Sequence, residues 1–385
     1  MHTTTDDVLP YPSVGVLHLT ISFAPGGRRD AIVTLAAASR PFGIRPHLAT
    51  LRGDPADSTP FRHNFDSDQS LEIEGRPSLR QLLDLRRHCV AQGIRIVHAH
   101  DASSQFVASM LRIVAPSLHV VMTFHRSLGF ESAGWRNRLR NAATLTLVDR
   151  VLTASGERRE HFIAENRIPG RKVTTIPLGI DLERFRPDAL ARAQVRAEFG
   201  VGPDELLIVS AGHYGPEKGL DIAVTAVGLS RDTLSQRGFV VRHLHMGTGD
   251  PDRIAWMKAR VEEAGDATTL IGQRPDPERI LAAADLLLHT PRLEAFGLVL
   301  VQAMAVGLPV VASSVGGIPE IVAAGVGDLV PAGDPRATAE QLDALLADPG
   351  RRRAMAAAAV QRAHAEYGAA TFARRHRELY DTLWP

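Results

Sequence analysis

Short hydrophobic runs alternate with longer amphipathic segments through most of the chain. In the first half, the runs predict strands at residues 14–21, 44–51, 94–100, 119–124, 150–155 and 173–178. The intervening segments have the spacing or length of helices, at residues 28–40, 78–92, 102–113 and 133–147. Strands separated by helix-length segments are typical of parallel sheets that helices cover on both faces.

A second series of the same kind follows. Its strands are predicted at residues 206–212, 240–247, 267–272, 285–290, 308–313 and 327–332. Its helices are predicted at residues 217–230, 252–264, 276–284, 297–306, 317–324 and 335–348. The two series predict an α/β protein with two Rossmann-like, doubly wound parallel-sheet domains. Ligands bind such sheets at the carboxyl ends of the strands, so two facing sheets would place the site in the cleft between them.

The break between the two series falls in residues 177–193, which carry two prolines and a glycine before a charged helical stretch. We therefore expect an N-terminal domain over residues 1–187 and a C-terminal domain over residues 188–365. The tail is rich in Arg and Ala and helical in pattern. Phe372, Leu379 and Leu383 recur in it at roughly helical spacing, so this helix needs a surface to cover.

Composition excludes several classes of protein. The 385 residues are 44% hydrophobic and 23% charged, which is ordinary for a globular chain and excludes a disordered one. A net charge of +1 provides no overall field toward nucleic acid, so no nucleic-acid partner is expected. Cys89 is the only cysteine, which excludes an intramolecular disulfide. The start does not resemble a signal peptide and no apolar run approaches ~18 residues, so a cytoplasmic protein is expected.

Two stretches carry candidate chemistry. In SAGHYGPEKGLDIAV (210–224), a strand ends at Gly212 and a Gly- and Pro-containing loop leads to Lys218, a flexible point charge for a phosphate. In residues 289–322, a strand leads to the carboxylate of Glu294, and a Phe-Gly pair then opens a helix. A helix N-terminus favours anions, so a carboxylate beside it suits a diphosphate that carries a polyol. Each stretch alone would be weak evidence.

In combination, these motifs closely resemble the family 4 glycosyltransferases. The resemblance rests on PEKG (216–219), EAFGL (294–298), QAMAVGLPVVAS (302–313) and GGIPEIV (316–322). The N-terminal half contains looser matches, in the order and with the spacing of the family: VHAHD (97–101), TFHR (123–126), DRVLTAS (149–155) and IPLGIDLERFRP (176–187). The resemblance implies a GT-B fold, a nucleotide-diphosphate sugar donor and transfer with retention at the anomeric carbon. It also implies that the last helix, residues 366–385, crosses back and packs on the N-terminal domain.

The resemblance implies roles for individual residues. Lys218 would bind the donor diphosphate, and Glu294 would hydrogen-bond hydroxyls of the donor sugar. His125 resembles the family histidine beside the transferred sugar, and Gly26 and Gly27 resemble the glycine turn near the phosphates and the acceptor. We assign His125 and Glu294 to catalysis, and the donor-binding set is Gly26, Gly27, His213, Lys218, Phe296, Gly297, Leu298 and Gln302.

Two positions depart from the family pattern. His213 stands where the family has an arginine, and Gln302 stands where it has a second glutamate, eight positions after Glu294. A neutral imidazole cannot replace a bidentate guanidinium on a diphosphate. Arg292 and His245, at neighbouring strand ends, are the candidates for supplying the missing charge. Donor binding is expected to be weaker than in the family, or different.

Three weaker signals remain. His98 and His100 are two apart on a strand and could face one side as metal ligands, but no cluster of carboxylates or cysteines accompanies them, so no metal is predicted. GTGD (247–250) lacks the third glycine of a dinucleotide turn. In residues 134–145, arginines lie near Trp135; this segment is either a solvated helix or a basic patch for an anionic acceptor or a membrane surface. The arginines are Arg136, Arg138 and Arg140.

These observations predict a metal-independent, retaining hexosyltransferase without a cofactor. It would move a hexosyl or N-acetylhexosaminyl group from a nucleotide-diphosphate sugar, UDP being preferred, to an acceptor hydroxyl. The acceptor is expected to be a small molecule, a lipid-linked molecule or a glycan, with peripheral contact at the inner face of a membrane as a further expectation. Two alternatives remain open: a catalytically silent GT-B protein that binds nucleotide sugars, and a GT-B sugar-nucleotide epimerase.

Overall fold

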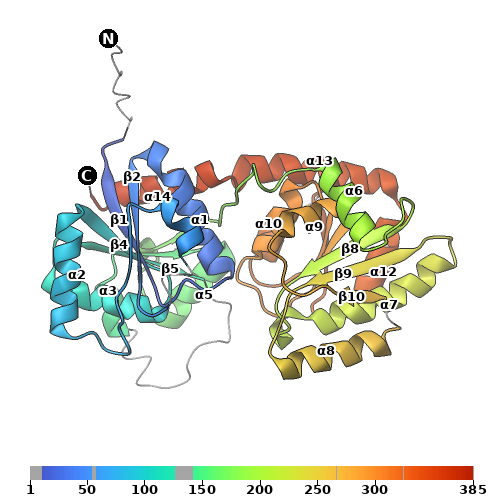
Figure 1. Ribbon diagram of the computed structural model, residues 1–385, viewed down its shortest axis with the longest axis horizontal. Helices are drawn as coiled ribbons and strands as arrows, with labels where there is room; N and C mark the ends of the chain where they lie inside the picture. The colour runs from blue at the N-terminus through green and yellow to red at the C-terminus, as the bar shows by residue number, and fades with distance from the viewer. Residues whose placement is uncertain (1–10, 54–57, 126–141, 266, 324, 385) are drawn as a thin grey trace, which may run out of the picture. The chain divides into compact units, whose positions relative to one another are not determined.

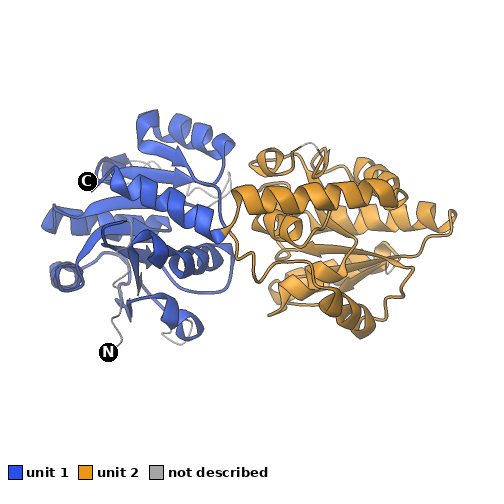
Figure 2. Cartoon of the chain, turned by 90° about the horizontal axis from the view of Figure 1, so that it is seen from above, with its two compact units in different colours: residues 1–179, 369–385 blue, residues 180–368 orange. Residues whose placement is uncertain are grey.

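The computed structural model describes residues 11–53, 58–125, 142–265, 267–323 and 325–384 (Figure 1). The chain divides into two compact units, one made of residues 1–179 and 369–385 and the other of residues 180–368 (Figure 2). Unit 1 is therefore built from two separate pieces of the sequence. Where the chain returns toward unit 1, the backbone N–H of Ile180 donates to the carbonyl of Tyr367 at 2.8 Å.

Unit 1 contains a seven-stranded sheet in which every pair of neighbours is parallel. In spatial order its strands are β3 (Ser67–Ser70), β2 (Ile44–Thr50), β1 (Val14–Thr20), β4 (Ile94–Ala99), β5 (His119–Phe124), β6 (Arg150–Thr153) and β7 (Val173–Thr175). All seven residues of β1 are buried, as expected for a central parallel strand with both faces covered.

The helices of unit 1 are α1 (Gly27–Ser39), α2 (Leu79–Ala91), α3 (Ala102–Val114), α5 (Gly156–Asn166) and α14 (Ala369–Asp381). Short 3₁₀ turns lie at η1 (Arg40–Phe42), η3 (Thr59–Asn64) and η4 (Gly170–Lys172). The last helix, α14, packs against α1, and α2 packs against α3 (Figure 1). Phe372 and Leu379 on α14 are buried and Leu383 is half-buried, so the tail does cover a surface of unit 1.

Unit 2 contains a six-stranded sheet, also parallel throughout. In spatial order its strands are β10 (Thr268–Leu270), β9 (Val241–Met246), β8 (Leu206–Ala211), β11 (Leu286–His289), β12 (Val310–Ser313) and β13 (Gly327–Val330). In both units the chain starts at a central strand, winds to one edge, returns and winds to the other. The strand order reverses between β1 and β4 and between β8 and β11, which are the places where such sheets bind ligands.

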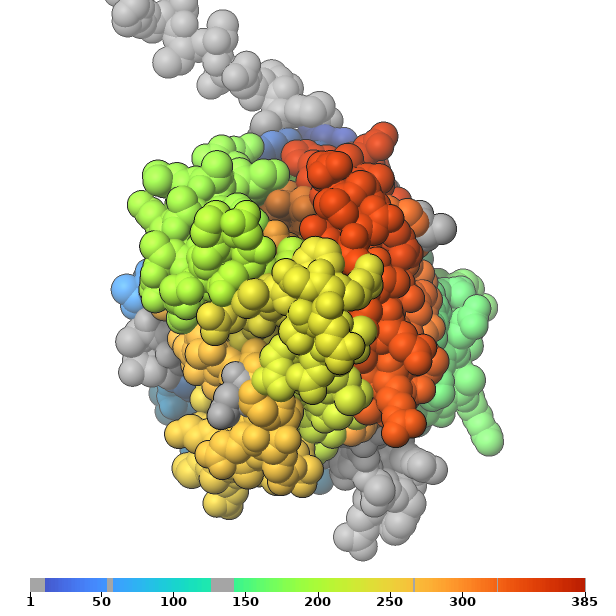
Figure 3. Space-filling model, turned by 90° about the vertical axis from the view of Figure 1, so that its right-hand side faces the viewer, coloured from blue at the N-terminus to red at the C-terminus, as the bar shows by residue number. Residues whose placement is uncertain are grey.

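The helices of unit 2 are α6 (Ala189–Glu198), α7 (Leu220–Ser235), α8 (Pro251–Glu263), α9 (Pro277–Ala283), α10 (Leu298–Ala305), α11 (Ile318–Ile321), α12 (Pro335–Leu346) and α13 (Pro349–Glu366), with a 3₁₀ turn η5 (Pro216–Lys218). One layer contains α7 packed on α12, and another contains α6 and α10 packed on α9. Helix α8 lies at the surface, in gold in Figure 3, and most of its residues are exposed.

The twelve strands expected from the sequence are all present, and the doubly wound α/β class is confirmed. The sequence pattern missed β3, a polar edge strand, and α5. The helix predicted at residues 133–147 lies mainly outside the described residues, as do Trp135, Arg136, Arg138 and Arg140.

Candidate active-site residues

An ion pair between Lys218 and Glu294 forms the centre of the candidate site in unit 2. Lys218 ends η5, directly after β8, and Glu294 lies in the loop between β11 and α10. Lys218 Nζ donates to Glu294 Oε2 at 2.8 Å, and the two side chains are 23% and 11% exposed. The two residues predicted to bind the donor diphosphate and the donor sugar are thus brought into direct contact.

Glu294 is ionised despite its burial. Burial opposes ionisation, but His289 and Lys218 outweigh it, and the pKa of Glu294 is held well below its usual value of 4.5. His289 ends β11, is 5% exposed, and places its Nε2 3.4 Å from Glu294 Oε2. Sequence reasoning did not single out His289; its only signal was its place at the end of a strand, five residues before Glu294.

Two glycines allow the loops around this ion pair to pack closely. A Cβ at Gly219 would lie 1.9 Å from the carbonyl oxygen of Thr290, and one at Gly316 would lie 1.8 Å from that of Glu294. Both glycines have positive φ, 60° and 53°, which L side chains rarely adopt. The loops that follow β8, β11 and β12 therefore meet backbone to backbone, and this contact fixes Lys218 and Glu294.

Helix α10 begins beside Glu294. Gly297 is its N-cap, with φ of 91° and no side-chain cap, and the nearest atoms to its Cβ position include Glu294 Cγ at 3.6 Å. Phe296 is buried and its ring lies against Tyr367, so its side chain serves the core. Leu298 and Gln302 are half-buried on the helix. The N-terminal end of α10 thus adds backbone dipoles to the charge of Lys218.

The two groups expected to supply the charge of the missing family arginine, Arg292 and His245, both have partners within unit 2. Arg292 forms a bidentate pair with Asp221, at 2.8 and 2.7 Å, and also donates to the carbonyl of Pro216. His245 contacts Ser210 and the carbonyl of Gly212, and burial lowers its pKa to about 4, so it is neutral at pH 7. His213 is exposed and pairs with Glu217.

In unit 1, the turn after β1 carries Gly26 and Gly27. Gly26 has φ of 144°, which favours glycine, whereas a Cβ at either Gly26 or Gly27 would meet no atom of the described part of the chain within 4 Å. Asp101 follows β4, and its Oδ2 accepts a hydrogen bond from the backbone N–H of Ile21 at 2.7 Å. The same oxygen lies 3.8 Å from a guanidinium nitrogen of Arg28. Asp101 therefore anchors the turn. The sequence motif VHAHD contains it, but sequence reasoning gave it no role.

His125 is half-buried and belongs to a cluster with four buried histidines; we define the histidine cluster as His18, His98, His100, His125 and His376. The ring of His100 is linked to both His125 and His18, by nitrogen–nitrogen contacts of 3.2 and 3.0 Å. His98 bonds to Thr123 at 2.6 Å and to Tyr380 of α14 at 2.8 Å. Burial lowers the pKa of each ring, to about 3 for His18 and His125 and about 4 for His376. The cluster is therefore neutral at pH 7.

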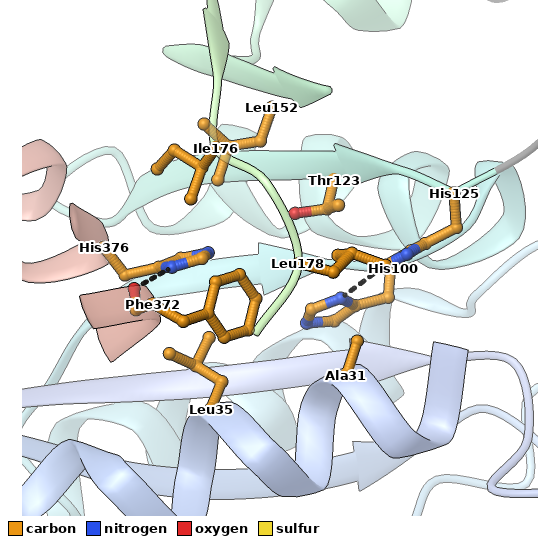
Figure 4. Close-up of a pocket in the computed structure, with 10 residues that line it drawn as sticks. All are labelled: Ala31, Leu35, His100, Thr123, His125, Leu152, Ile176, Leu178, Phe372 and His376. Atoms are coloured by element: carbon orange, nitrogen blue, oxygen red, sulfur yellow. Dashed lines mark hydrogen bonds between the residues drawn. The ribbon is translucent and has the colours of Figure 1, made fainter. Parts of the chain in front are cut away.

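A pocket lies against this cluster within unit 1 (Figure 4). Its ten lining residues are Ala31, Leu35, His100, Thr123, His125, Leu152, Ile176, Leu178, Phe372 and His376. The volume is about 270 Å³ including the open mouth, and the enclosed part admits about one water molecule. Phe372 and His376 belong to α14, so the tail contributes to the wall beside His125 as well as covering the unit.

His98 and His100, the weak metal-ligand candidates, are joined by His18, and nitrogens of the three rings lie within 4.8 Å of one another. The rings of His98 and His100 are stacked, with centroids 4.3 Å apart and an interplanar angle of 28°. Stacked rings direct their in-plane lone pairs side by side rather than toward one point. Both nitrogens of His98 also have hydrogen-bond partners. In the structure, His18 bonds to His100, and His98 bonds to Thr123 and Tyr380.

Comparisons with known proteins agree with this architecture. The family described as Glycosyltransferase Family 4 matches residues 25–184, and the family described as Glycosyl transferases group 1 matches residues 191–362. The fold is similar to that of HepE from Anabaena, solved in complex with UDP, with a TM-score of 0.84, 21% identity, and coverage of 96% of this chain and 100% of that one. The chain belongs to the family 4 glycosyltransferases and has the GT-B fold.

Curated relatives are similar over part of their length. The chain is 35% identical over 233 residues to D-inositol 3-phosphate glycosyltransferase 1 of Catenulispora acidiphila, covering 58% of this chain and 54% of that protein. It is 28% identical over 329 residues to the GPI3 subunit of phosphatidylinositol N-acetylglucosaminyltransferase of Saccharomyces cerevisiae, covering 81% and 68%. The chain spans about half the length of the D-inositol 3-phosphate glycosyltransferases that it matches.

Among the described residues, no helix combines the length and the apolar character that crossing a membrane requires.

Proposed function

We propose that this protein transfers a hexosyl or N-acetylhexosaminyl group from a UDP-sugar to an acceptor hydroxyl, with retention at the anomeric carbon and without a metal ion. The observation that carries the proposal is the Lys218–Glu294 ion pair beside the N-terminus of α10. A carboxylate and an ammonium 2.8 Å apart present a hydrogen-bond acceptor next to a cation. A sugar diphosphate has the matching pattern, hydroxyl donors next to an anion.

In the proposed reaction, Glu294 accepts hydrogen bonds from sugar hydroxyls while Lys218 and the backbone of α10 stabilise the charge that develops on the departing diphosphate. The acceptor hydroxyl attacks on the face from which the diphosphate leaves, which gives retention, and its proton passes to the oxygen of the departing diphosphate as the bond to the anomeric carbon breaks. His125 contacts the transferred sugar. No protein nucleophile is assigned. The solved UDP complex of HepE and the nucleotide-sugar chemistry of the family support UDP as the first donor to test.

The names of the curated relatives suggest the first acceptors. Both the bacterial and the yeast relatives are named for inositol-containing molecules, so inositol phosphate and phosphatidylinositol are the acceptors we would try before others. Purified protein would be incubated with UDP-, GDP-, ADP- and dTDP-sugars, with and without each acceptor and with EDTA. Release of nucleoside diphosphate and the mass of the product give the activity. The coupling constant of the anomeric proton in the product gives the stereochemistry.

A second candidate function is a silent nucleotide-sugar binder. The observation in its favour is that Arg292 and His213, two possible contributors to the diphosphate site, are paired with Asp221 and Glu217. Calorimetry that detects donor binding without turnover on any acceptor would favour this candidate. Absence of both binding and turnover across the donor panel would overturn both candidates.

A further inference from the structure

Three rings of the histidine cluster form a continuous hydrogen-bonded row that leads from the core of unit 1 to its pocket. His18 lies on β1 and is fully buried, His100 follows β4 and is 3% exposed, and His125 follows β5 at the pocket. The links are His18 Nδ1 to His100 Nε2 at 3.0 Å and His100 Nδ1 to His125 Nε2 at 3.2 Å (Figure 4 shows the second). Each ring of the row is thus tied to the next through a nitrogen.

Proton counting restricts the row to two arrangements. A neutral imidazole has one N–H and one lone pair, and each nitrogen–nitrogen bond needs one of each. If each ring donates to the next ring toward the pocket (the outward arrangement), every ring carries its proton on Nδ1. If each ring donates in the opposite direction (the inward arrangement), every ring carries it on Nε2. The tautomer of His125 is therefore coupled to that of a histidine in the core.

The inner end of the row decides between the arrangements. His18 Nε2 is buried and has no hydrogen-bond partner among the residues that the structure describes. The inward arrangement would place an N–H there without an acceptor, and buried N–H groups without a partner are rarer in proteins than buried acceptors without one. The outward arrangement leaves only a bare lone pair at that position. We propose that His100 is a positioning residue that holds His125 in the tautomer with its proton on Nδ1 and its Nε2 engaged as an acceptor.

This assignment has a chemical consequence, which rests on the proposed function. With Nε2 occupied by the N–H of His100, the ring nitrogen that His125 can offer to a ligand is Nδ1, and it carries a proton. His125 then donates a hydrogen bond to an oxygen of the sugar or the acceptor, and it does not remove a proton from either. The row acts as a fixed donor and not as a base.

The neighbours of the row are consistent with a fixed arrangement. His376 donates from Nδ1 to the carbonyl of Phe372 at 2.9 Å, and His98 is held between Thr123 and Tyr380. Burial most of all, and then the guanidinium of Arg28 and the ring of His376, disfavour a charge on His125. The proton of each ring therefore stays within the neutral network at pH 7.

The test is a long-range ¹H–¹⁵N spectrum of the full chain labelled at histidine, recorded at pH 7.5, with His125 assigned through His125→Gln. The expected wild-type result is a single His125 tautomer, protonated at Nδ1. His100→Phe should give a mixture of tautomers at His125. His100→Asn, whose amide can still donate to His125 Nε2, should keep the single one. The matched control is His47→Phe, because His47 is an equally buried histidine on β2, bonded to Ser67, outside the row.

Three results would overturn the proposal. These are a proton on Nε2 of His125 in the wild type, a His125 tautomer that His100→Phe does not change, and stoichiometric Zn²⁺ binding that shifts the ring signals of His18 and His100. The wild-type spectrum and His100→Asn keep the test decisive if His100→Phe does not fold. None of these spectra needs a substrate, so they stand even if the proposed function fails.

A kinetic measurement then tests the role. With a donor and acceptor that turn over, His100→Phe should lower kcat at least about tenfold while the donor Kd stays within about twofold, and His100→Asn should recover most of kcat. An unchanged kcat beside an altered tautomer would overturn the positioning role. Lack of turnover by the wild type would overturn the proposed function alone.

Discussion

The two units share a topology but differ in how they handle polar groups at the carboxyl ends of their central strands. Unit 1 places histidines there, which are linked to one another and to Tyr380. Burial lowers the pKa of these histidines, so they are neutral at pH 7. Unit 2 places an ion pair there, Lys218 and Glu294, in which opposite charges outweigh burial. Two sheets of the same winding thus hold a neutral histidine cluster in one unit and a buried ion pair in the other.

The difference is chemically useful. A neutral, hydrogen-bonded network fixes direction, because each ring must donate at one nitrogen and accept at the other. A buried ion pair fixes position, because separating the charges in a poorly solvated site is costly. In the proposed reaction, the ion pair of unit 2 would bind the charged part of the donor.

Removal of the tail should have the largest effect, and it should destabilise unit 1 but not unit 2. Deletion of residues 369–385 removes α14 and leaves His98 without Tyr380 and the buried face of α1 uncovered. We expect unit 1 to lose its cooperative unfolding while the contiguous unit 2 keeps its fold. Hydrogen exchange measured by mass spectrometry on peptides from β1 and β8 would show this. Equal protection of both strands, as in the intact chain, would contradict it.

Acid should distinguish the units next. Burial lowers the folded-state pKa of His18 and His125 to about 3 and of His376 to about 4, whereas an unfolded histidine takes up its proton near 6.5. Between these values the unfolded state binds more protons, so stability falls as pH falls, by up to about 1.4 kcal/mol per pH unit for each such ring.

Glu294 behaves differently, because its lowered pKa makes its contribution present above 4.5 and lost only below that value. In unit 2, burial lowers the pKa of His243 to about 3 and that of His245 to about 4, so the stability of unit 2 also falls with pH, but through fewer rings. We expect β1 and β4 to lose protection at a higher pH than β8 and β11 when the protein is acidified from pH 7.5 to 5, after correction for intrinsic exchange. Simultaneous loss in both units would refute this order.

Lys218→Ala tests the charged site directly. Loss of the ammonium should weaken donor binding about 10- to 100-fold and lower turnover with it, because the diphosphate is charged in both the ground and transition states. Glu294 would also lose its ammonium partner, so the melting temperature should fall. The matched control is Lys258→Ala on the exposed face of α8. An unchanged donor Kd, measured by calorimetry, would remove Lys218 from the site.

The smallest expected effect concerns the two departures from the family. In a double-mutant cycle on donor Kd, His213→Arg alone should give a small gain, because Glu217 already pairs with position 213. Gln302→Glu alone should give little gain or a loss, since it adds a negative charge near a diphosphate. The double variant should improve affinity by more than the sum. Additivity within ~0.3–0.5 kcal/mol would show that the two positions are independent.

The sequence was sufficient for the fold class and for the two residues of the ion pair in the candidate site. Apolar runs and helix-length segments located twelve strands, and the motifs led to Lys218 and Glu294, which the structure brings together. The edge strand β3 was missed because its residues, Ser-Asp-Gln-Ser, are polar.

The missed part of the site depends on contacts between residues far apart in the chain. The pairing of Arg292 with Asp221 leaves no mark on local pattern, so Arg292 looked available. The histidine cluster draws on three strands or their ends and on α14, and the bond between His98 and Tyr380 joins residues 282 positions apart. Such a cluster becomes visible only once the sheet order is known.

Because unit 1 includes residues 369–385, the ribosome must synthesise all of unit 2 before unit 1 can be completed. At about 5–20 residues per second, the wait is on the order of 10–40 s. Throughout that time, nascent unit 1 lacks the helix that later packs on α1, and His98 lacks its tyrosine partner. We therefore expect translation speed and chaperone access during this interval to affect the yield of folded protein. The contacts of the folded protein alone do not reveal either factor.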